Sequence, residues 1–374
     1  MGDAVPEVTR EQVLAYRAAE HGLSGEPAAE LDGLGVLDLG VQDTPAGSAR
    51  LALAARMKAV PDLDGDDRYA LVWSLRGAPH LYRARDVRQV AERAWPVSEA
   101  DAHARLVNAP RIADAGIGAV EAFTLAARAL RDAVPAPTAK GTASAEVTRL
   151  LPGGLSTWCE PCGARHVFGD LFLQAGVFAG VGITNDTSPP TLLPLPGWPG
   201  VPERSAGAAG LIAAYLRRNG PAAPVDVAAF LGTSRAVVSS QWPGGLAEVS
   251  VDGRAAWLPE DRLDELRSPP PPAPVRLLPP SDPFLQARDR DLLIPDRSLH
   301  KALWRAIGGP GAVLVDGDVA GTWRARKAGK ARLELTVDPF APLPPPVRDA
   351  VLPEAERVAA ARGAPAVEVR FAGD

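Results

Sequence analysis

The sequence has 374 residues, which is too long for one small domain and suggests two or three. Hydrophobic residues make up 46% and charged residues 23%, the balance of a packed globular protein, and no run of about 18 apolar residues could span a membrane. The net charge of −5 argues mildly against a nucleic-acid partner, but this total hides an uneven distribution.

The first third of the chain has the order of a winged helix-turn-helix. A helix is predicted to begin after Thr9, because Gln12 stands where a capping box needs it. A buried turn or extended segment then ends at Gly40, and a second clear helix begins at Ser48. Residues 69–82 are rich in β-forming side chains around Gly77-Ala78-Pro79, which predicts a hairpin with its turn near residues 76–79.

The same order of elements recurs twice. The second unit has helical patterns followed by apolar, strand-like pieces, and the third has helix–turn–helix–turn–helix and then a hairpin with Asp252-Gly253 at its turn. The predicted helices of the second unit are 98–108, 117–134 and 142–150, its strands lie around 155–168, and the third unit starts at 206 with its last helix at 234–242.

The C-terminal part is predicted to be a mixed α+β region behind a proline-rich linker, 268–274. Its elements are an Asp-Gly hairpin at 313–323, a strand at 332–337, a helix at 353–362 and a closing strand at 366–371.

The sequence therefore predicts an α+β protein of three tandem winged helix-turn-helix modules and a C-terminal mixed α/β extension. The expected boundaries are 1–97, 98–204 and 205–267 for the modules and 275–374 for the extension.

Charge is distributed in blocks along the chain. Residues 1–67 carry 13 acids against 5 bases, whereas residues 68–131 carry 10 arginines against 6 acids. A third block, 322–332, has five bases and no acid. Either basic block could contact phosphate, since such contacts depend on local potential, or could be an ordinary solvated face.

Two cysteines and a histidine have the spacing of half a zinc site. Cys159, Cys162 and His166 form this group, but a structural zinc ion needs four ligands, and no second pair lies nearby. A site would have to recruit an acid or a distant histidine such as His103. We therefore expect no metal, and expect these side chains to pack in the second hairpin.

Nucleotide cofactors find no support in the sequence. The Gly-Gly pairs at 153–154, 244–245 and 308–309 lack the Lys-Ser/Thr or the strand context of phosphate-binding loops. The N-terminus has no basic region followed by an apolar run, so we expect no signal peptide, a reducing cytoplasmic location and no cofactor.

Five segments together resemble the bacterial tandem winged-helix DNA glycosylases, a family that includes enzymes acting on alkylated purines and on azinomycin-type interstrand crosslinks. They appear in the family's order across nearly the whole chain: GVQDTPAGSARLALAAR, WSLRGAPHLY, YLRRNGPAAPVDVAAFLG, VRLLPPSDPFLQARDRDLL and GAVLVDGDVAGTW. The resemblance implies three winged helices around a DNA duplex, with a C-terminal extension that completes the scaffold.

The family's catalytic motif is Gln-apolar-Gln or Gln-apolar-Asp, and the corresponding residues here are Gly40-Val41-Gln42. Oxygens at such positions can stabilise the positive charge that builds on the sugar as a base departs, and can orient water. Gln42 keeps the second position, but Gly40 has no side chain at the first. Three alternatives follow: Asp43 replaces the missing oxygen, Gln42 suffices for a lesion that leaves easily, or the protein binds DNA without catalysis. Polar residues here are otherwise ordinary helix caps.

The resemblance also implies DNA contacts. Arg76 and His80 match an Arg-Gly-x-x-His element expected beside the active pocket, although a turn arginine and a backbone-bonded histidine would have the same pattern. Asp282, Arg288, Asp289 and Arg290 resemble another element, which could contact phosphate or form a structural ion-pair network. The full set of expected DNA-binding residues is Arg76, His80, Arg83, Arg85, Arg290, Arg324, Arg326 and Lys327.

Two functions remain open at this point. The first is a monofunctional glycosylase that hydrolyses the N-glycosidic bond of alkylated or crosslinked purines in double-stranded DNA, with Gln42 and Asp43 as catalytic residues. The second is a non-catalytic winged-helix DNA-binding protein, regulatory or lesion-sensing, which Gly40 favours. A monomer is expected in both cases, because repeated modules can embrace a duplex without a second subunit. On the first interpretation, restoring a side chain with Gly40→Gln should raise activity.

Overall fold

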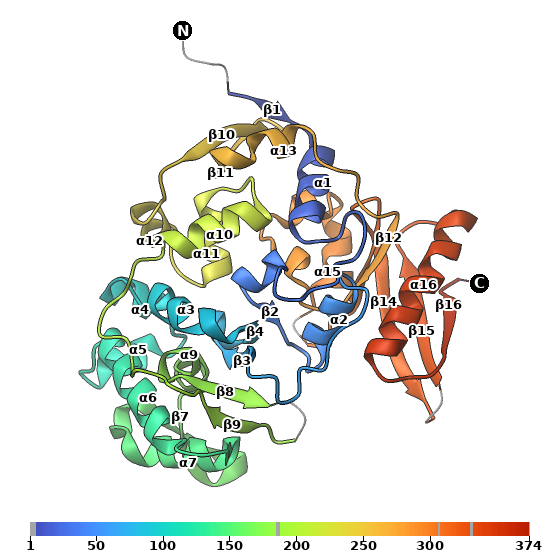
Figure 1. Ribbon diagram of the computed structural model, residues 1–374. Coiled ribbons are helices and arrows are strands. Elements are labelled where there is room, and N and C mark those ends of the chain that lie inside the picture. Colours follow the sequence, from blue (N-terminus) through green and yellow to red (C-terminus); the bar gives the residue numbers. More distant parts are fainter. Residues whose placement is uncertain (1–4, 185–187, 306, 330–331, 374) are drawn as a thin grey trace.

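The computed structural model describes residues 5–184, 188–305, 307–329 and 332–373, which form a mixed α/β protein (Figure 1). Helices and strands alternate along the chain, and the described strands form four separate sheets. Among the helices of these described residues, none combines the length and the apolar character that crossing a bilayer requires.

The N-terminal elements form as the sequence predicts. The capping box of Thr9 and Gln12 starts α1 (Arg10–Glu20), a 3₁₀ turn covers Gly35–Asp38, and α2 spans Ser48–Ala54. Strands β3 (Tyr69–Trp73) and β4 (Pro79–Arg83) form the predicted hairpin, and β2 (Val41–Gln42) pairs with the free side of β4.

The hairpin β3–β4 is not a separate wing. It belongs to a six-stranded sheet with the order β2-β4-β3-β8-β9-β5, in which Val72 of β3 pairs with Gly182 of β8. The other strands are β5 (Thr138–Ala139), β8 (Val181–Thr184) and β9 (Thr191–Pro194). The strands expected near 155–168 form a separate two-stranded sheet, β6 (Ser156–Cys159) and β7 (Ala164–Val167). The second unit thus has two hairpins where the sequence predicted one.

Helix α3 ends the first unit, and the described residues of the second unit form six helices, α4 to α9. The predicted helices at 98–108, 117–134 and 142–150 correspond to α4, α6 and α7. The bounds are α3 Val87–Ala94, α4 Glu99–Arg105, α5 Ala109–Asp114, α6 Ala119–Ala133, α7 Lys140–Leu150, α8 Gly169–Gln174 and α9 Gly176–Ala179.

The third unit has the predicted three helices and a hairpin. The helices are α10 (Ala209–Asn219), α11 (Pro224–Leu231) and α12 (Arg235–Ser240), and Ser234 caps α12 by accepting the N–H of Val237. The hairpin pairs β10 (Leu246–Val251) with β11 (Arg254–Pro259). Its sheet gains a third strand from the other end of the chain, because β1 (Glu7–Val8) pairs in parallel with β10.

The C-terminal part contains a five-stranded sheet covered by a long helix (Figure 1). Helix α16 begins at Pro345 rather than at the predicted Pro353, because prolines are favourable in the first turn of a helix and Pro353 is accommodated inside it. The remaining bounds are α13 Leu263–Arg267, β12 Val275–Leu278, α14 Arg290–Leu293, α15 His300–Leu303, β13 Gly311–Val315, β14 Asp318–Ala328, β15 Arg332–Pro339, α16 Pro345–Ala361 and β16 Val367–Phe371.

The core crosses the boundaries that the sequence suggested. One hydrophobic cluster runs from Leu39 to Val238 and includes residues of all three units. The expected linker, 268–274, is also fixed, since the N–H of Ala273 donates to the carbonyl of Leu23. The boundaries themselves stay a prediction, but the units share packing rather than standing apart.

Candidate functional site

Gln42 lies in β2, the edge strand of the six-stranded sheet, and the pairing of β2 with β4 fixes its position. In β2 it pairs with His80, while its neighbour Val41 pairs with Leu81. Because side chains alternate along a strand, Val41 is fully buried in the apolar cluster that contains α2, whereas Gln42 faces the other side and is half-buried.

Gln42 lines a small cavity of about 20 Å³. Its walls come from distant parts of the chain: His21 after α1, His80 in β4, Phe230 in α11 and Gln286 in the 3₁₀ turn Pro283–Gln286. A water molecule needs about 10–15 Å³ of such space, so the cavity has room for one water and not for a base.

Arg76 joins the two glutamines. Its Nη2 lies 3.3 Å from Oε1 of Gln42 and 3.4 Å from Oε1 of Gln286. Its Nη1 donates to the carbonyl of Phe230, and the guanidinium lies 4.9 Å from the centre of the Phe230 ring. Burial, together with the charge of Arg288, lowers the pKa of Arg76 to about 9. Arg76 therefore keeps its charge at neutral pH but holds it in a poorly solvated place.

His80 is part of a buried chain of hydrogen bonds. Its Nδ1 lies 3.0 Å from Oγ of Ser74 and 2.9 Å from the carbonyl of Ala78, and Ser74 Oγ lies 2.9 Å from the hydroxyl of Tyr82. Burial and the nearby charge of Arg76 lower the pKa of His80 to about 3, and burial raises the pKa of Tyr82 to about 12. Both side chains are therefore neutral at physiological pH.

The structure explains why position 40 is glycine. Gly40 has φ +79°, and a Cβ placed there would lie 2.5 Å from Cζ of Tyr82 and 2.9 Å from Cβ of His80. The tyrosine ring occupies the space in which a side chain at position 40 would have to lie.

Asp43 points away from the cavity. Its buried carboxylate accepts the N–H of Ala49 in the first turn of α2 at 2.9 Å, and its own N–H donates to the carbonyl of Pro79. Asp43 is not among the residues around the cavity that holds Gln42. The structure thus separates the two residues that the sequence paired as catalytic candidates.

A groove of about 620 Å³ adjoins the cavity, and Gln286 lines both. We call it the arginine groove. Thr44 and Pro45, directly after the Gln42 segment, form one part of its wall, and no carboxylate is found among the described residues that line it. Its cations are Arg288, Arg290 and Arg305.

The groove combines positive charge with an aromatic surface. The guanidinium of Arg290 lies 4.7 Å from the centre of the Trp304 ring. Arg288 hydrogen-bonds Gln286, and burial lowers the pKa of both arginines. Neither has a carboxylate partner within salt-bridge distance in the part of the chain that the structure describes. A partly buried arginine without a carboxylate partner forms a strong, charge-assisted hydrogen bond when it binds a phosphate group.

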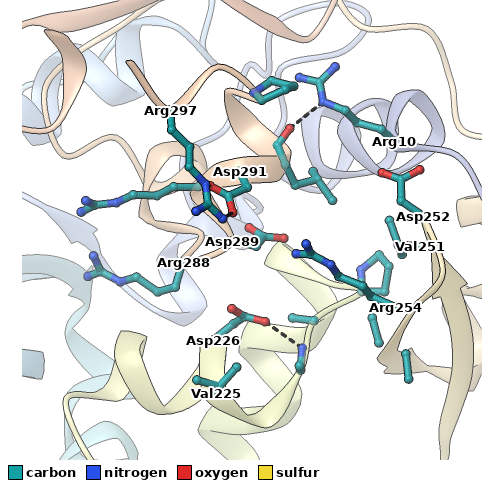
Figure 2. Close-up of a pocket in the computed structure, with 18 of the residues that line it drawn as sticks. Arg10, Val225, Asp226, Val251, Asp252, Arg254, Arg288, Asp289, Asp291 and Arg297 are labelled. Carbon is teal, nitrogen blue, oxygen red and sulfur yellow. Dashed lines mark hydrogen bonds and ion pairs between the residues drawn. The ribbon is translucent and has the colours of Figure 1, made fainter. Parts of the chain in front are cut away.

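A second, larger pocket of about 730 Å³ shares Arg288 and Arg290 but has mixed charge. Figure 2 shows arginines and aspartates interleaved on its walls. Asp289 binds Arg17 at 2.6 Å, and Asp291 pairs with Arg297. Because its charges largely cancel, this pocket fits a polyanion less well than the arginine groove does. The labelled charged residues are Arg10, Arg254, Arg288 and Arg297 with Asp226, Asp252, Asp289 and Asp291.

The acids and the arginines of the segment from Asp282 to Arg290 have different surroundings. Asp282 forms a fully buried bidentate pair with Arg56, and Asp289 pairs with Arg17, so the acids hold the fold together. Arg288 and Arg290 remain available to a ligand in the groove.

Half of the ten arginines in the basic block at 68–131 pair with carboxylates within the protein. Arg83 pairs with Asp38 and Asp86, and Arg85 makes a bidentate pair with Asp32. Arg68, Arg88 and Arg105 also pair with neighbouring carboxylates. The block is therefore not a continuous patch of free positive charge.

The predicted C-terminal contacts lie on the strand β14, away from the cavity. Arg324, Arg326 and Lys327 are mostly exposed, Arg326 pairs with Glu334, and Arg324 donates to the carbonyl of Gly308 beside the groove. Of the eight DNA-binding candidates, the structure places His80 in the cavity wall, Arg76 in contact with Gln42 and Gln286 of that wall, and Arg290 in the groove.

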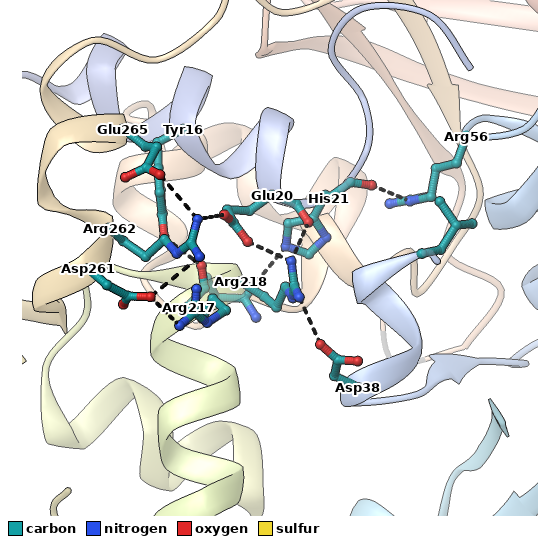
Figure 3. A network of polar contacts seen from close by, with 12 residues as sticks. Tyr16, Glu20, His21, Asp38, Arg56, Arg217, Arg218, Asp261, Arg262 and Glu265 are labelled. Carbon is teal, nitrogen blue, oxygen red and sulfur yellow. Dashed lines mark hydrogen bonds and ion pairs between the residues drawn. The ribbon is translucent and has the colours of Figure 1, made fainter. Parts of the chain in front are cut away.

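An ion-pair network includes one residue of the cavity wall, Arg218 (Figure 3). Arg218, which lines the cavity, pairs with Glu20 at 2.6 Å and with Asp38 at 2.8 Å, so it ties α10 to α1 and to the 3₁₀ turn before β2. Next to it, His21 contacts Asn219, and burial holds the pKa of His21 well below its usual value.

Sequence reasoning missed several residues of the site. Gln286 and Tyr82 lie in segments that resemble the glycosylase family, so position in those segments was an available signal. Ser74 and Phe230 also lie in such segments, whereas His21 lies outside all five, and only the fold brings it to the cavity.

All three comparisons with known proteins match this chain to DNA glycosylases. Residues 33–361 match the family model described as DNA glycosylase AlkZ-like. The interstrand DNA cross-link repair glycosylase of Streptomyces sahachiroi is 32% identical over 184 residues, 46% of this chain and 48% of that protein. The chain thus matches about half the length of this curated relative. The structure of the S. sahachiroi DNA glycosylase AlkZ superimposes with a TM-score of 0.74 at 22% identity, over 98% of this chain and 100% of that chain.

Proposed function

We infer the activity of this chain from its family: it belongs to the AlkZ-like DNA glycosylases, and we propose that it hydrolyses the N-glycosidic bond of alkylated or crosslinked purines in double-stranded DNA. The observation that carries this proposal is Gln42, whose amide oxygen is held by Arg76 at a cavity that fits one water molecule.

Gln42 would act on the sugar. As the purine leaves, positive charge develops around C1′, and a fixed amide oxygen stabilises that charge and accepts a hydrogen bond from the attacking water. Neutral His80 adds no opposing charge, although its low pKa makes it a weak base. Arg76 would oppose a cation directly, so we assign it to positioning Gln42 and Gln286 and to phosphate contact.

Asp43 has a different role in this proposal. Its carboxylate caps the first turn of α2 and so fixes the chain directly after Gln42. Gln42 would work as the single side-chain oxygen of the motif, which suits purines that carry a positive charge and leave readily. N7-alkylated purines have this property.

The size of the cavity bears on how the lesion is bound. A space of about 20 Å³ holds the water but not an extruded base. We propose that the sugar approaches from the arginine groove while the modified base stays outside, which would allow bulky or crosslinked adducts. Arg288 and Arg290 would bind the flanking phosphates, and the three helix–hairpin units would act as tandem winged helices around the duplex.

No cofactor is needed for this reaction, and one chain supplies every group that it uses, so we propose a cofactor-independent monomer. The alternative is a non-catalytic lesion-binding protein. The observation in its favour is Gly40, where the ring of Tyr82 excludes any side chain.

The test is release of free base from a duplex containing one N7-alkylguanine. Wild type should release the base, and Gln42→Ala should slow release by about 10²-fold or more, since a single stabilising oxygen contributes on this order. Gln89→Ala, on the exposed side of α3, is the matched control and should keep full activity.

Duplex binding by fluorescence anisotropy separates the two functions. Normal binding without base release in wild type would support the non-catalytic alternative. Full activity in Gln42→Ala would remove Gln42 from the mechanism.

A further inference from the structure

The hairpin β6–β7 gathers three metal-binding side chains far from the cavity. One ligand atom from each of Cys159, Cys162 and His166 lies within 4.8 Å of the others. We propose that these three residues form a zinc-binding site that closes this hairpin, contrary to our expectation from the sequence.

Strand register places the ligands together. Thr157 pairs with His166 and Cys159 pairs with Ala164, so Cys159 and His166 lie on the same face of the hairpin. Cys162 reaches that face from the 3₁₀ turn Glu160–Cys162. Gly163, with φ +59°, then reverses the chain into β7.

One ring nitrogen of the histidine has no hydrogen-bond partner in the part of the chain that the structure describes. Nε2 of His166 is buried and has no hydrogen-bond partner among the described residues. A buried polar atom without a partner costs free energy, and metal coordination removes that cost.

The two thiols lie close together, since the sulfurs of Cys159 and Cys162 are within 4.8 Å of each other. A divalent cation between two cysteine sulfurs at this spacing can bind both.

The donor set selects the metal. Two sulfurs and one imidazole suit zinc, and sulfurs on one tetrahedral zinc ion lie roughly 3.8 Å apart, so the present spacing needs only a small contraction. No fourth His, Cys or acid of the described residues joins this group. Water would therefore complete the coordination, and its exchange makes the site open rather than fully enclosed.

The site has a clear structural use. Each strand of this two-stranded sheet has four residues, and such a hairpin is only marginally stable alone. Zinc with two thiolates is electrically neutral, so its effect would be on the geometry of the hairpin rather than on its charge.

The first test measures zinc by elemental analysis in tag-free, full-length protein. We expect about one zinc ion per chain in wild type, and its loss in Cys162→Ser and in His166→Ala. His103→Ala, an exposed histidine on α4 outside the cluster, is the matched control and should retain zinc. Circular dichroism checks that each variant is folded.

The second test replaces zinc with Co²⁺. Wild type should show a thiolate-to-cobalt charge-transfer band in the near ultraviolet, and Cys159→Ser/Cys162→Ser should not. A chelator should lower the melting temperature of wild type but not that of this double variant.

Three outcomes would overturn the proposal. They are wild type without zinc and without the cobalt band, zinc that persists in both single variants, and a Cys159–Cys162 disulfide detected as the absence of free thiols in unreduced wild-type protein.

Discussion

At the residue scale, the site depends on a glycine that looked like a defect in the sequence. Gly40 stands where a catalytic side chain was expected, and the structure fills that space with Tyr82. Tyr82 in turn holds Ser74 and His80 in one hydrogen-bonded chain. Position 40 thus contributes to the site by leaving room for an aromatic ring.

This reverses the expectation that Gly40→Gln would raise activity. The substitution combines a strained backbone conformation with a collision against Tyr82, so we expect Gly40→Ala and Gly40→Gln to lower both stability and base release. The backbone strain alone costs about 1–3 kcal/mol. Urea unfolding and the base-release assay measure the two effects.

Gly65→Ala is the matched control for this prediction. Gly65 has φ +77°, but a Cβ there meets nothing within 4 Å, so only the backbone strain applies. We expect a modest loss of stability and full activity. Equal losses in Gly65→Ala and Gly40→Ala would show that contact with Tyr82 is unimportant.

At the element scale, the arginine groove takes Arg288, Arg290 and Trp304 from a segment that also contains structural acids. Asp282 pairs with Arg56, and Asp289 pairs with Arg17. Arg288 and Arg290 remain without carboxylate partners among the described residues, next to Trp304.

We expect Arg288→Ala and Arg290→Ala to weaken duplex binding, each reducing the slope of log affinity against log salt by about 1, because each removes one phosphate contact. Fluorescence anisotropy with an undamaged duplex at several salt concentrations gives the slope. Arg85→Ala is the control, since Asp32 already neutralises Arg85. A slope change in Arg85→Ala as large as that in Arg290→Ala would move the DNA contact to the β3–β4 hairpin.

Local elements could be read from the sequence because their signals are local. The hairpins around Gly77 and Asp316-Gly317 and the cap of α12 at Ser234 follow from turn and capping residues. The pairing of β3 with β8 could not be predicted from the sequence. It rests on one residue pair, Val72 and Gly182, and neither segment has a sequence pattern that indicates its partner. The same holds for Arg76, whose contact with Gln286 spans 210 positions.

The number of arginines in a segment was also a poor guide to its free positive charge, for a physical reason. The block at 68–131 has an excess of bases, but half of its arginines find carboxylates, several of them in the acidic block 1–67 or within their own helix. The motif residue Gln42 was predicted, whereas its partners depended on tertiary structure.

At the scale of the whole molecule, the N-terminal part and the C-terminal part are joined by a buried ion pair. Arg56 follows α2, Asp282 follows β12, and both side chains are fully buried with two hydrogen bonds between them. This pair lies directly before the turn that carries Gln286, so it also positions one wall of the cavity.

We expect Asp282→Ala to destabilise the protein by about 3–5 kcal/mol, because it leaves the Arg56 charge buried without a partner. Asp318→Ala removes the half-exposed partner of Arg10 and should cost less than about 1 kcal/mol. The double variant Arg56→Met/Asp282→Leu should recover most of the lost stability. Chemical denaturation compares the three, and a small effect of Asp282→Ala would contradict the assignment.

The shared sheet has a consequence for dissecting this protein. A fragment ending near residue 97 would keep Gln42 and His80 but would present β3 as a bare edge, with Val72 and Trp73 stripped of β8 and α9. Such a piece would be prone to self-association instead of giving a minimal enzyme. The three units repeat an order of elements, yet because they share a sheet and a core they would have to be expressed and engineered together.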